Sequence, residues 1–585
     1  MRGLLTELRR RNVHRAALAY IAGCWLLVQL AQTMSEIYEF DPAIIRWLIT
    51  AMLIGFVPAM IASWVFEWRG GQMLKQSEAD SVATSAASSR ALDRVIIAVL
   101  AAAVLVFSLD KFLGEETLAP NSADFQTLAV LPFDDMTATQ DQAWFADGLA
   151  EELLNLLASN DAIRVVARTS SFSFRRRDDS AQVIGRELGV GHLLQGSVRR
   201  DGDAMRVTVQ LIDVATGFSV WSETYNDDWQ SVFDVQDRIA ARIAGQLQVR
   251  ALSERRSPRA KPEAYTLYLK GRFAAQQGGQ EQLERAATYL RESAEIDPEF
   301  APTWASLSAV YGNLAGQSLR PREETFVLAR AAAERAIEVD PDYWGGYSQL
   351  AWIAHRYDGD LGSAVSHMQR AIDRGSGGVP LYGRVAVLLL QLGRLDEAIK
   401  ALEYCAERSP VSPAAHYNLG MAYKYANRLE AAERSFRRTL TLNAEYRSAR
   451  YSLGEVLLLL GRVEEAQQTW SVDDYVSTQM GRVVTTFELD GEAAGLAALE
   501  AFTARWGDTW PSTVADVHAW RGDLDAAFEW IEKDIEKYGS AGWGELRQNR
   551  FFDNLHDDPR WPDLLERMGV SDEQLAAYTL ESRLD

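Results

Sequence analysis

Cysteine and histidine are scarce in this chain. Its 585 residues include 2 cysteines and 7 histidines. Cys24 lies in an apolar run and Cys405 in a helical repeat, so we expect no disulfide between them. No HExxH motif is present, and no histidine pair stands at ligand spacing beside a carboxylate. The sequence therefore predicts no zinc or di-metal centre and no cofactor.

Positive charge is also in short supply. Lysine and arginine together number 60 against 81 aspartates and glutamates, which gives a net charge of −21. Neutralising nucleic-acid phosphates requires a basic face, so we expect no nucleic acid among the partners. The chain is too long for one hydrophobic core, and its length predicts about three or four domains.

Long uncharged runs are concentrated near the N-terminus. Residues 16–34 carry no charge and are long enough to cross a hydrocarbon core of ~30 Å. Residues 44–64 form a second candidate span, and residues 91–113 form a third if Arg94 and Lys111 reach toward the interfaces. The alternative is a cleaved signal peptide, which is disfavoured because a second span follows at once. We predict three transmembrane helices at about 16–34, 44–64 and 91–113.

The distribution of arginine predicts the topology of these spans. Residues 1–15 are rich in arginine, residues 37–43 carry acidic groups and no basic ones, and residues 69–94 are again basic. The positive-inside rule then makes residues 1–15 a short cytoplasmic N-terminus and places everything after Gly114 in the periplasm. We therefore expect a multi-pass protein of the bacterial inner membrane with periplasmic C-terminal domains. If the third segment did not span, those domains would be cytoplasmic.

Residues 124–250 show a different pattern, in which strand-like and helix-like segments alternate. Residues 205–213 (MRVTVQLID) alternate apolar and polar side chains, as a half-buried antiparallel strand does. The whole stretch predicts a compact mixed α/β domain. The expected strands are 127–133, 163–167, 192–198, 205–213 and 218–222, and the expected helices are 143–155, 183–188 and 232–247.

A 34-residue period is the strongest signal in the chain. Small residues recur at this spacing on paired helical segments, where they allow close helix approach, and bulky apolar residues fill the space between. This pattern is typical of tetratricopeptide repeats (TPRs). We predict a TPR array over residues 260–475, and further TPR-like helices with a C-terminal cap over 476–569. The two columns of small residues are Ala386, Gly420 and Gly454, and Ala398, Ala432 and Ala466; the expected apolar face of the cap is Trp561, Leu564, Leu565 and Met568.

Several stretches resemble a known family. TLAVLPFDDM, WFADGLAEELLNLLA, IGRELGVGHLLQGSVRR and VTVQLIDVATGFSVWSETY resemble the α/β domain that precedes TPRs in many bacterial membrane proteins. The region from about Phe125 to Val249 is similar to the N-terminal domain of TolB and to the FlgO family. The resemblance extends to the RRNVHRAALAYIAGCWLL opening and to residues 551–569. It implies the architecture and a periplasmic location, and it implies no catalytic constellation.

A stacked array presents a concave groove lined mainly by the first helix of each repeat, and such grooves bind proteins or extended peptides. Six residues are candidates for that wall, and ordinary solvated helix faces are the alternative for each. The candidates are Tyr268, Tyr311, Arg384, Asn418, Lys424 and Tyr425.

The α/β region contains an acidic trio, Asp147, Glu151 and Glu152. It could form an acid site, but we favour Asp147 as a helix cap with the two glutamates in the first turn. Residues 169–171 with the arginines at 175–177 could bind an anion, and a solvated loop is the favoured alternative.

The remaining motifs of this region offer no chemistry. His192 is expected at the start of a strand. Gly185, Gly189 and Gly191 do not fit a GxGxxG nucleotide loop. With no nucleophile–base pair, metal set or phosphate loop, we predict that the protein is not an enzyme.

The sequence favours a membrane-anchored TPR scaffold for protein–protein interaction on the periplasmic side, without catalysis. The alternative is a sensor or regulatory membrane protein related to TPR-containing transcription regulators or adenylate cyclases, but without their cytoplasmic output domain. About 15 residues precede the first span and about 25 lie in the cytoplasmic loop, whereas independent folding needs roughly 40. The partner and the oligomeric state stay open at this point.

Overall fold

The computed structural model describes residues 126–249, 259–538 and 546–584, apart from positions 138, 161, 176 and 376. It also gives the backbone of an antiparallel strand pair, β1 (Phe66–Arg69) and β2 (Gln72–Lys75). The chain divides into two compact units, Met1–Ala123 and Asp124–Asp585. The three predicted membrane spans lie outside the described residues. Among those that are described, no helix combines the length and the apolar character needed to cross a membrane.

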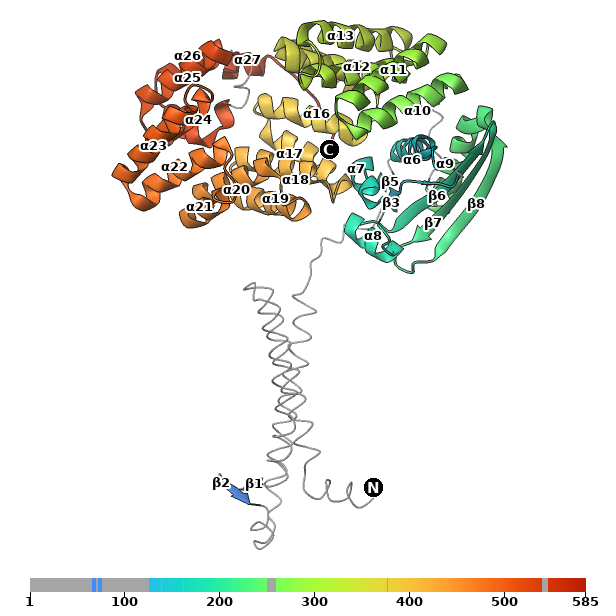
Figure 1. Ribbon diagram of the computed structural model, residues 1–585, viewed down its shortest axis with the longest axis horizontal. Helices are drawn as coiled ribbons and strands as arrows, with labels where there is room; N and C mark the ends of the chain where they lie inside the picture. Colours follow the sequence, from blue (N-terminus) through green and yellow to red (C-terminus); the bar gives the residue numbers. More distant parts are fainter. Residues whose placement is uncertain are drawn as a thin grey trace. The chain divides into compact units, whose positions relative to one another are not determined.

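The second unit begins with a mixed α/β domain built on one sheet (Figure 1). The strand order is β5-β3-β6-β7-β8, with β4 paired to β6. Strand β3 runs parallel to β5 and β6, whereas β6, β7 and β8 are antiparallel. The strands are β3 (Gln126–Val130), β4 (Asp134–Asp135), β5 (Ile163–Val165), β6 (His192–Asp201), β7 (Ala204–Asp213) and β8 (Ser219–Asp228). Strand β8 continues past the predicted end at residue 222, because it pairs with β7 as far as Ala204.

Alternating side chains of β3 divide the domain core between the two faces of the sheet. Leu128 and Val130 pack in the cluster that contains helices α6 (Ala143–Ala158) and α9 (Val232–Gln246). Ala129 and Leu131 pack on the opposite face with helix α8 (Ala181–Leu188). A buried central strand with apolar residues on both faces thus explains the continuous apolar run in β3.

Two local predictions for this domain are wrong. Helix α6 begins at Ala143, so Asp147 lies inside the helix and does not cap it. The helix begins at the predicted residue, four positions before Asp147, and Trp144 and Phe145 in its first turn bury their rings in the core. The segment expected as a loop is helical instead, with α7 at Arg168–Ser171 and a 3₁₀ turn, η1, at Phe172–Phe174.

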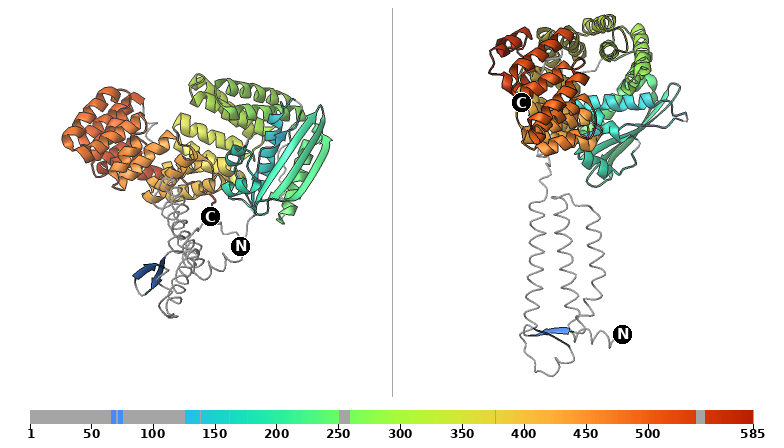
Figure 2. Two further views of the ribbon diagram at one scale, coloured as in Figure 1. Left: turned by 60° about the horizontal axis from the view of Figure 1, so that its bottom comes forward. Right: turned by 60° about the vertical axis from the view of Figure 1, so that its left-hand side comes forward.

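The rest of the unit is helical, and successive helices pair as antiparallel hairpins that stack along a curved array (Figure 2). A π-helical turn, η3 (Ala354–Asp358), follows α14. The hairpins are α10 (Pro262–Gln277) with α11 (Gln280–Ile296), α12 (Ala301–Gly316) with α13 (Arg322–Val339), α14 (Trp344–Ile353) with α15 (Leu361–Arg374), α16 (Gly378–Gln391) with α17 (Leu395–Arg408), α18 (Pro413–Tyr425) with α19 (Leu429–Leu442), α20 (Arg447–Leu459) with α21 (Val463–Trp470), α22 (Val476–Asp490) with α23 (Glu492–Trp506), and α24 (Pro511–Arg521) with α25 (Leu524–Tyr538).

The predicted columns of small residues lie where paired helices meet. An ideal Cβ added to Gly420 would stand 2.7 Å from the ring of Phe436, and one added to Gly454 would stand 2.2 Å from the indole of Trp470. Both distances are shorter than real Cβ contacts, so only glycine fits these packed positions. The alanines of the two columns are completely buried. This packing confirms the 34-residue period.

Short helices follow the last hairpin. They are η5 (Leu546–Gln548), η6 (Arg550–Leu555), α26 (Arg560–Arg567) and α27 (Asp572–Ala576). Trp561 and Leu564 are buried in the core of the last hairpins, and Leu565 and Met568 pack against it. Residues 577–584, here called the closing segment, are without regular structure and lie against α15, α16 and α17.

Candidate interaction surfaces

The structure places the six predicted groove residues in three different environments. All six lie on the first helices of their hairpins, as expected. Four are buried, one is half-buried and one is exposed. The buried residues are Tyr268, Tyr311, Lys424 and Tyr425, the half-buried one is Arg384, and the exposed one is Asn418.

Tyr268 lies under the α/β domain. Its hydroxyl accepts a hydrogen bond from Arg272 Nη1 at 3.0 Å, and its ring meets that of Phe300 edge-on with 5.2 Å between centroids. Burial raises the pKa of Tyr268 to about 12, so the hydroxyl stays protonated at neutral pH. Its position on the repeat helix was predictable, but its covering by a separate domain was not.

Lys424 is neutralised inside the array. Its Nζ lies 2.7 Å from Glu455 Oε2, and both side chains are less than a tenth exposed. Asp516 belongs to the same group of charges, and Asn549 Nδ2 donates to its Oδ1 at 2.8 Å. Burial raises the pKa of Asp516 to about 7, and the charge of Glu455 adds to the rise. These residues come from the first helices α18, α20 and α24 and from the cap. The spacing of Lys424 and Glu455, 31 positions and thus near one repeat, was the available signal.

Arg384 carries a positive charge and has no acidic partner among the residues that the structure describes. Its Nη1 donates to the backbone oxygen of Ser348 at 3.0 Å and to the hydroxyl of the same residue at 2.9 Å. Its guanidinium lies over the ring of Trp352 at 5.3 Å, and Arg356 lies 5.7 Å from that ring. Burial alone lowers the pKa of Arg384 to about 10, since no acidic side chain in the described ranges pairs with it. It therefore remains charged at neutral pH.

The π-helical turn η3 contributes to this patch. It places His355 beside Trp352, with 5.7 Å between ring centroids, and it carries Arg356. Burial lowers the pKa of His355 to about 4, and the charge of Arg356 lowers it further, so the imidazole is neutral. Such π-helical insertions occur frequently at functional sites. We call Trp352, His355, Arg356 and Arg384 the arginine–tryptophan patch.

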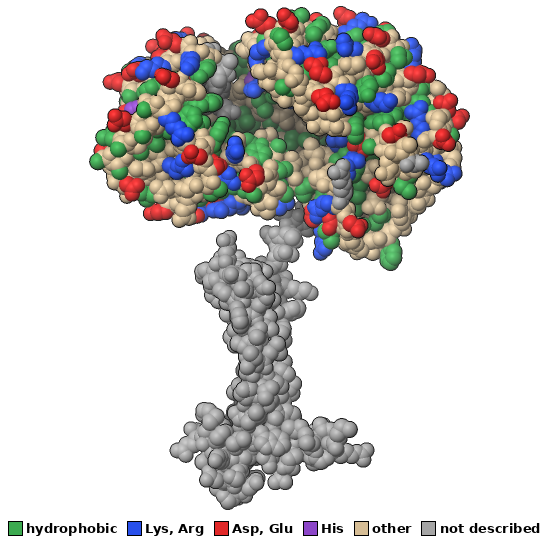
Figure 3. All heavy atoms as spheres, viewed as in Figure 1, with side chains coloured by type: hydrophobic (Ala, Val, Ile, Leu, Met, Phe, Trp, Pro, Cys, Tyr) green, Lys and Arg blue, Asp and Glu red, His purple; other side chains and the backbone are tan. Residues whose placement is uncertain are grey.

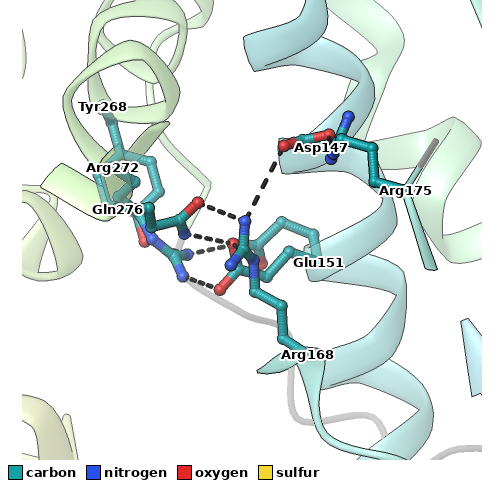
Figure 4. Close-up of polar contacts among 8 residues, drawn as sticks. Asp147, Glu151, Arg168, Arg175, Tyr268, Arg272 and Gln276 are labelled. Carbon is teal, nitrogen blue, oxygen red and sulfur yellow. Dashed lines mark hydrogen bonds and ion pairs between the residues drawn. The ribbon is translucent and has the colours of Figure 1, made fainter. Parts of the chain in front are cut away.

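The acidic trio lies at the junction between α6 and the first repeat helix, α10, and Figure 4 shows two of its members, Asp147 and Glu151. Arg272 on α10 donates to Glu152 at 3.1 Å and also to Glu151. Arg168 on α7 pairs with Glu151 at 3.2 Å, and Arg175 pairs with Asp147. Every acid of the trio thus has an arginine partner.

This pairing decides what the trio does. The pKa values of Asp147 and Glu152 are raised overall, because the effect of burial exceeds the opposite effect of the neighbouring arginines. A catalytic acid requires a reacting group within reach, whereas these carboxylates are held by guanidinium groups from α7, from the end of η1 and from α10. The network joins the α/β domain to the array.

A second contact ties the α/β domain to the middle of the array. The backbone nitrogen of Ala167 donates to the oxygen of Arg408 at 2.6 Å, and that of Val411 donates to the hydroxyl of Ser170 at 3.3 Å. Arg164 and Glu407 lie 3.6 Å apart. The domain therefore contacts both α10 and the α17–α18 turn, which Figure 1 shows on either side of α6 and α7. Ser170 and Ser171, once candidates for an anion site, are buried.

His192 begins β6, as predicted. Its Nδ1 is buried without a hydrogen-bond partner. Gly185 lies inside α8 and Gly189 ends that helix in the left-handed conformation, so these glycines shape a helix. In the described parts of the chain, no group of three metal-ligating side chains is arranged around a common point.

Comparison with known proteins identifies parts of the chain. Residues 384–424 and 417–469 match the tetratricopeptide repeat family. Residues 123–242 match the second domain of HilA/YgeH-like transcriptional regulators. This match covers the α/β domain, for which the sequence had suggested similarity to TolB and FlgO; that similarity is not shown.

A curated relative, “Putative adenylate cyclase 3” of Rhizobium meliloti (strain 1021), is 35% identical over 231 residues. The match covers 38% of this chain and 39% of that protein, so the chain spans less than half of its relative.

Two solved structures are similar to the chain at low identity and low TM-score. The human IFIT1 dimer with m7Gppp-AAAA is 14% identical, with 52% of this chain and 77% of that chain covered and a TM-score of 0.33. The PilF protein of Pseudomonas aeruginosa is also 14% identical, with 36% and 96% covered and a TM-score of 0.30. The chain thus contains tetratricopeptide repeats joined to an α/β domain that is similar to the second domain of HilA/YgeH-like transcriptional regulators.

Proposed function

We propose that this protein is a regulatory scaffold that holds an extended, acidic segment of a partner protein against the arginine–tryptophan patch. The repeats supply a rigid curved support, and such supports present extended binding surfaces. Figure 3 shows a hollow at the centre of the array, in which hydrophobic side chains are visible. The unbalanced charge of Arg384 is the observation that carries this proposal.

The charge argument rests on what surrounds Arg384. A partly buried cation is stabilised best by a carboxylate, yet within the described part of the chain the acceptors of Arg384 are the neutral residues Ser348 and Gln349. Arg356 adds a second positive charge near the same indole ring. An aspartate or glutamate from a partner would neutralise this patch, and Trp352 would pack against the neighbouring apolar side chain. The net charge of −21 supports a protein partner over a nucleic acid.

Two matches support a regulatory role. The α/β domain resembles a domain of transcriptional regulators, and the curated relative is named for a cyclase. Neither activity is carried over, because the matched regions are only parts of those proteins. The arginine network fastens this domain to α10, so a change at the repeats would be transmitted to it as a rigid body.

The membrane anchor belongs to the same proposal. The uncharged runs at 16–34, 44–64 and 91–113, with the arginine bias around them, support three spans and a periplasmic array in the inner membrane. The protein would then bind its partner outside the cytoplasm and act through another protein. Catalysis by this chain is not part of the proposal.

Site-specific crosslinking in cells tests the proposed surface. A photo-crosslinking amino acid is placed at Asn418, which is exposed on α18, and as a control at Lys400, which is exposed on the second helix α17. We expect a discrete crosslinked protein from position 418 and not from position 400. The change Arg384→Glu should abolish the crosslink, and Arg384→Lys should keep part of it, because lysine retains the charge but loses the fork of donors. A crosslink at 418 that Arg384→Glu leaves unchanged would contradict the proposal.

A further inference from the structure

The closing segment lies on helices that precede it by about 200 residues. The backbone oxygen of Leu580 accepts from Arg394 Nη1 at 2.6 Å, across 186 positions of the chain. The backbone nitrogen of Glu581 donates to Gln369 Oε1 at 2.7 Å, across 212 positions. The array thus uses side chains of α15 and of the α16–α17 turn to hold the main chain of an extended segment.

Side chains of the closing segment alternate between contact and exposure. Leu580 is completely buried in the core cluster that contains Tyr347, Met368 and Leu388. Ser582 is also buried, and Leu584 packs against the cluster formed by helices α16 to α18. Between these side chains lies Arg583, which pairs with Asp373 at 2.7 Å. Main-chain bonds with pockets for alternate side chains are the usual way in which a protein recognises an extended peptide.

We propose that helices α15 to α18 form a docking surface for an extended protein segment with two leucines four residues apart and an arginine before the second. In this structure the closing segment, with the sequence Leu580-Glu-Ser-Arg-Leu584, occupies that surface. A partner segment of the same chemistry displaces it. The inference rests on the proposed scaffold function, because it names a second contact that a partner makes with the same array.

The contacts explain why the segment can leave its place. Leu580 supplies the one completely buried side chain between residues 577 and 584, and the Arg583–Asp373 pair is half exposed. Exposed ion pairs contribute little to binding. Attachment to the chain compensates for these weak contacts, since a tethered segment has an effective concentration of about millimolar or higher. A free peptide must therefore compete with an occupant that is weak by itself but always present.

Peptide binding to two forms of the chain tests the proposal. The probe is a fluorescent peptide of residues 575–585, and its anisotropy is followed with the complete chain and with a chain that ends at Ala576. We expect the shortened chain to bind the peptide at least tenfold more tightly than the complete chain does. The peptide change Leu580→Asp should weaken binding at least tenfold, because a carboxylate would enter a buried apolar site.

Exchange of the charges at Arg583 and Asp373 provides a control, because a general loss of stability would not be rescued by the second change. The peptide change Arg583→Asp should weaken binding to the shortened chain two- to fivefold, as expected for an exposed pair. The change Asp373→Arg in the shortened chain should restore binding of the Arg583→Asp peptide.

Three outcomes would overturn the inference. Loss of cooperative unfolding in both the shortened chain and the complete chain with Leu580→Asp would make the segment a permanent part of the core. A shortened chain that folds and binds no peptide would show that the surface does not recognise a free segment. Concentration-dependent dimers of the complete chain in sedimentation would show that the surface exchanges segments between copies. The loss of the crosslink at Asn418 in Arg384→Glu reports on the scaffold function separately, so it can be observed when the peptide test fails.

Discussion

Arg272 Nη1 lies 3.1 Å from Glu152 Oε1 and so links the first helix of the repeat array to helix α6 of the α/β domain. The same guanidinium contacts Glu151 and the hydroxyl of Tyr268. If neutral residues replaced its partners, each of these partly buried charges would lack an opposite charge. This network therefore joins the two domains, together with the contact at the α17–α18 turn.

Replacement of Arg272 by glutamine should separate the two domains energetically. Loss of the guanidinium leaves Glu151 and Glu152 close together without their shared cation. We expect this to lower the free energy of unfolding by about 2–4 kcal/mol, because breaking a fully buried pair costs about 3–5 kcal/mol and this one is partly exposed. Calorimetry of the complete chain should then resolve an additional transition. The control is Arg285→Gln, which removes an exposed pair with Glu281 and should change stability by less than ~0.5 kcal/mol. Equal effects of the two changes would contradict a structural role for the junction.

Asp516 should make the array less stable as pH rises from about 4 to about 7. Burial raises its pKa from 3.8 to about 7, so between these values the folded chain holds a proton that the unfolded chain releases. Stability from this group is therefore greatest below about pH 4 and is lost as pH rises to about 7. Comparison of thermal unfolding at several values from pH 5 to pH 8 should show a smaller decline in Asp516→Asn than in the wild type. An unchanged slope in this variant would exclude Asp516 as the cause.

Two glycines on first helices allow a matched test of the packing. Gly420→Ala should destabilise the array by about 1–3 kcal/mol, because its Cβ would stand 2.7 Å from the buried ring of Phe436. Gly312→Ala on α12 meets open space and should be neutral or stabilising by up to ~1 kcal/mol through helix propensity. Chemical denaturation of both variants measures the difference. If Gly420→Ala were as stable as Gly312→Ala, the close approach at this hairpin would be refuted.

The proposed topology predicts the activity of fusions. Alkaline phosphatase joined after Ala260 should be active, and the same enzyme joined after Lys75 should be inactive, because the arginine bias places only the former outside. Enzyme activity in intact cells, normalised to the amount of fusion protein, is the measurement. The reverse order would place the repeats in the cytoplasm.

Single replacements in the α/β domain separate a scaffold from an enzyme. Asp147→Asn and Glu151→Gln should act through folding alone, each with a loss of about 1–3 kcal/mol, because each weakens a charged hydrogen bond. His192→Ala should keep partner crosslinking at position 418. The measurement pairs the melting temperature with the phenotype in cells for each variant. A variant with wild-type stability and complete loss of function would argue for catalysis in this domain.

The acidic trio illustrates why local patterns are ambiguous. An aspartate followed by two glutamates has the composition of a helix start, and the same residues also suit an ion-pair network. The approach of Arg175 and Arg272, which come from other elements, decides between these alternatives. Residue spacing within α6 contains no information about those partners.

The candidate groove residues show a similar limit. Their positions on first helices followed from the period, but their exposure depended on what covers each helix. The α/β domain covers Tyr268, the pair with Glu455 neutralises Lys424, and Arg384 keeps its charge without an acid. The aromatic and basic residues Trp352 and Arg356, four positions apart, were the available signal for the patch and were missed.

The sequence by itself determined the order of the chain's parts, the mixed α/β domain and the repeat period. Each hairpin buries its small residues against its neighbours in the chain, so the packing leaves a periodic trace that can be counted. Only the tertiary structure decided the ends of the array: α6 covers α10, and the closing segment returns to α15. These contacts join residues separated by more than 100 positions, such as Arg272 with Glu152 and Arg394 with Leu580. The contact of Arg394 with Leu580 depends on the curvature summed over the intervening hairpins, and that of Arg272 with Glu152 on how the α/β domain folds against the first repeat. No local pattern of residues encodes either arrangement.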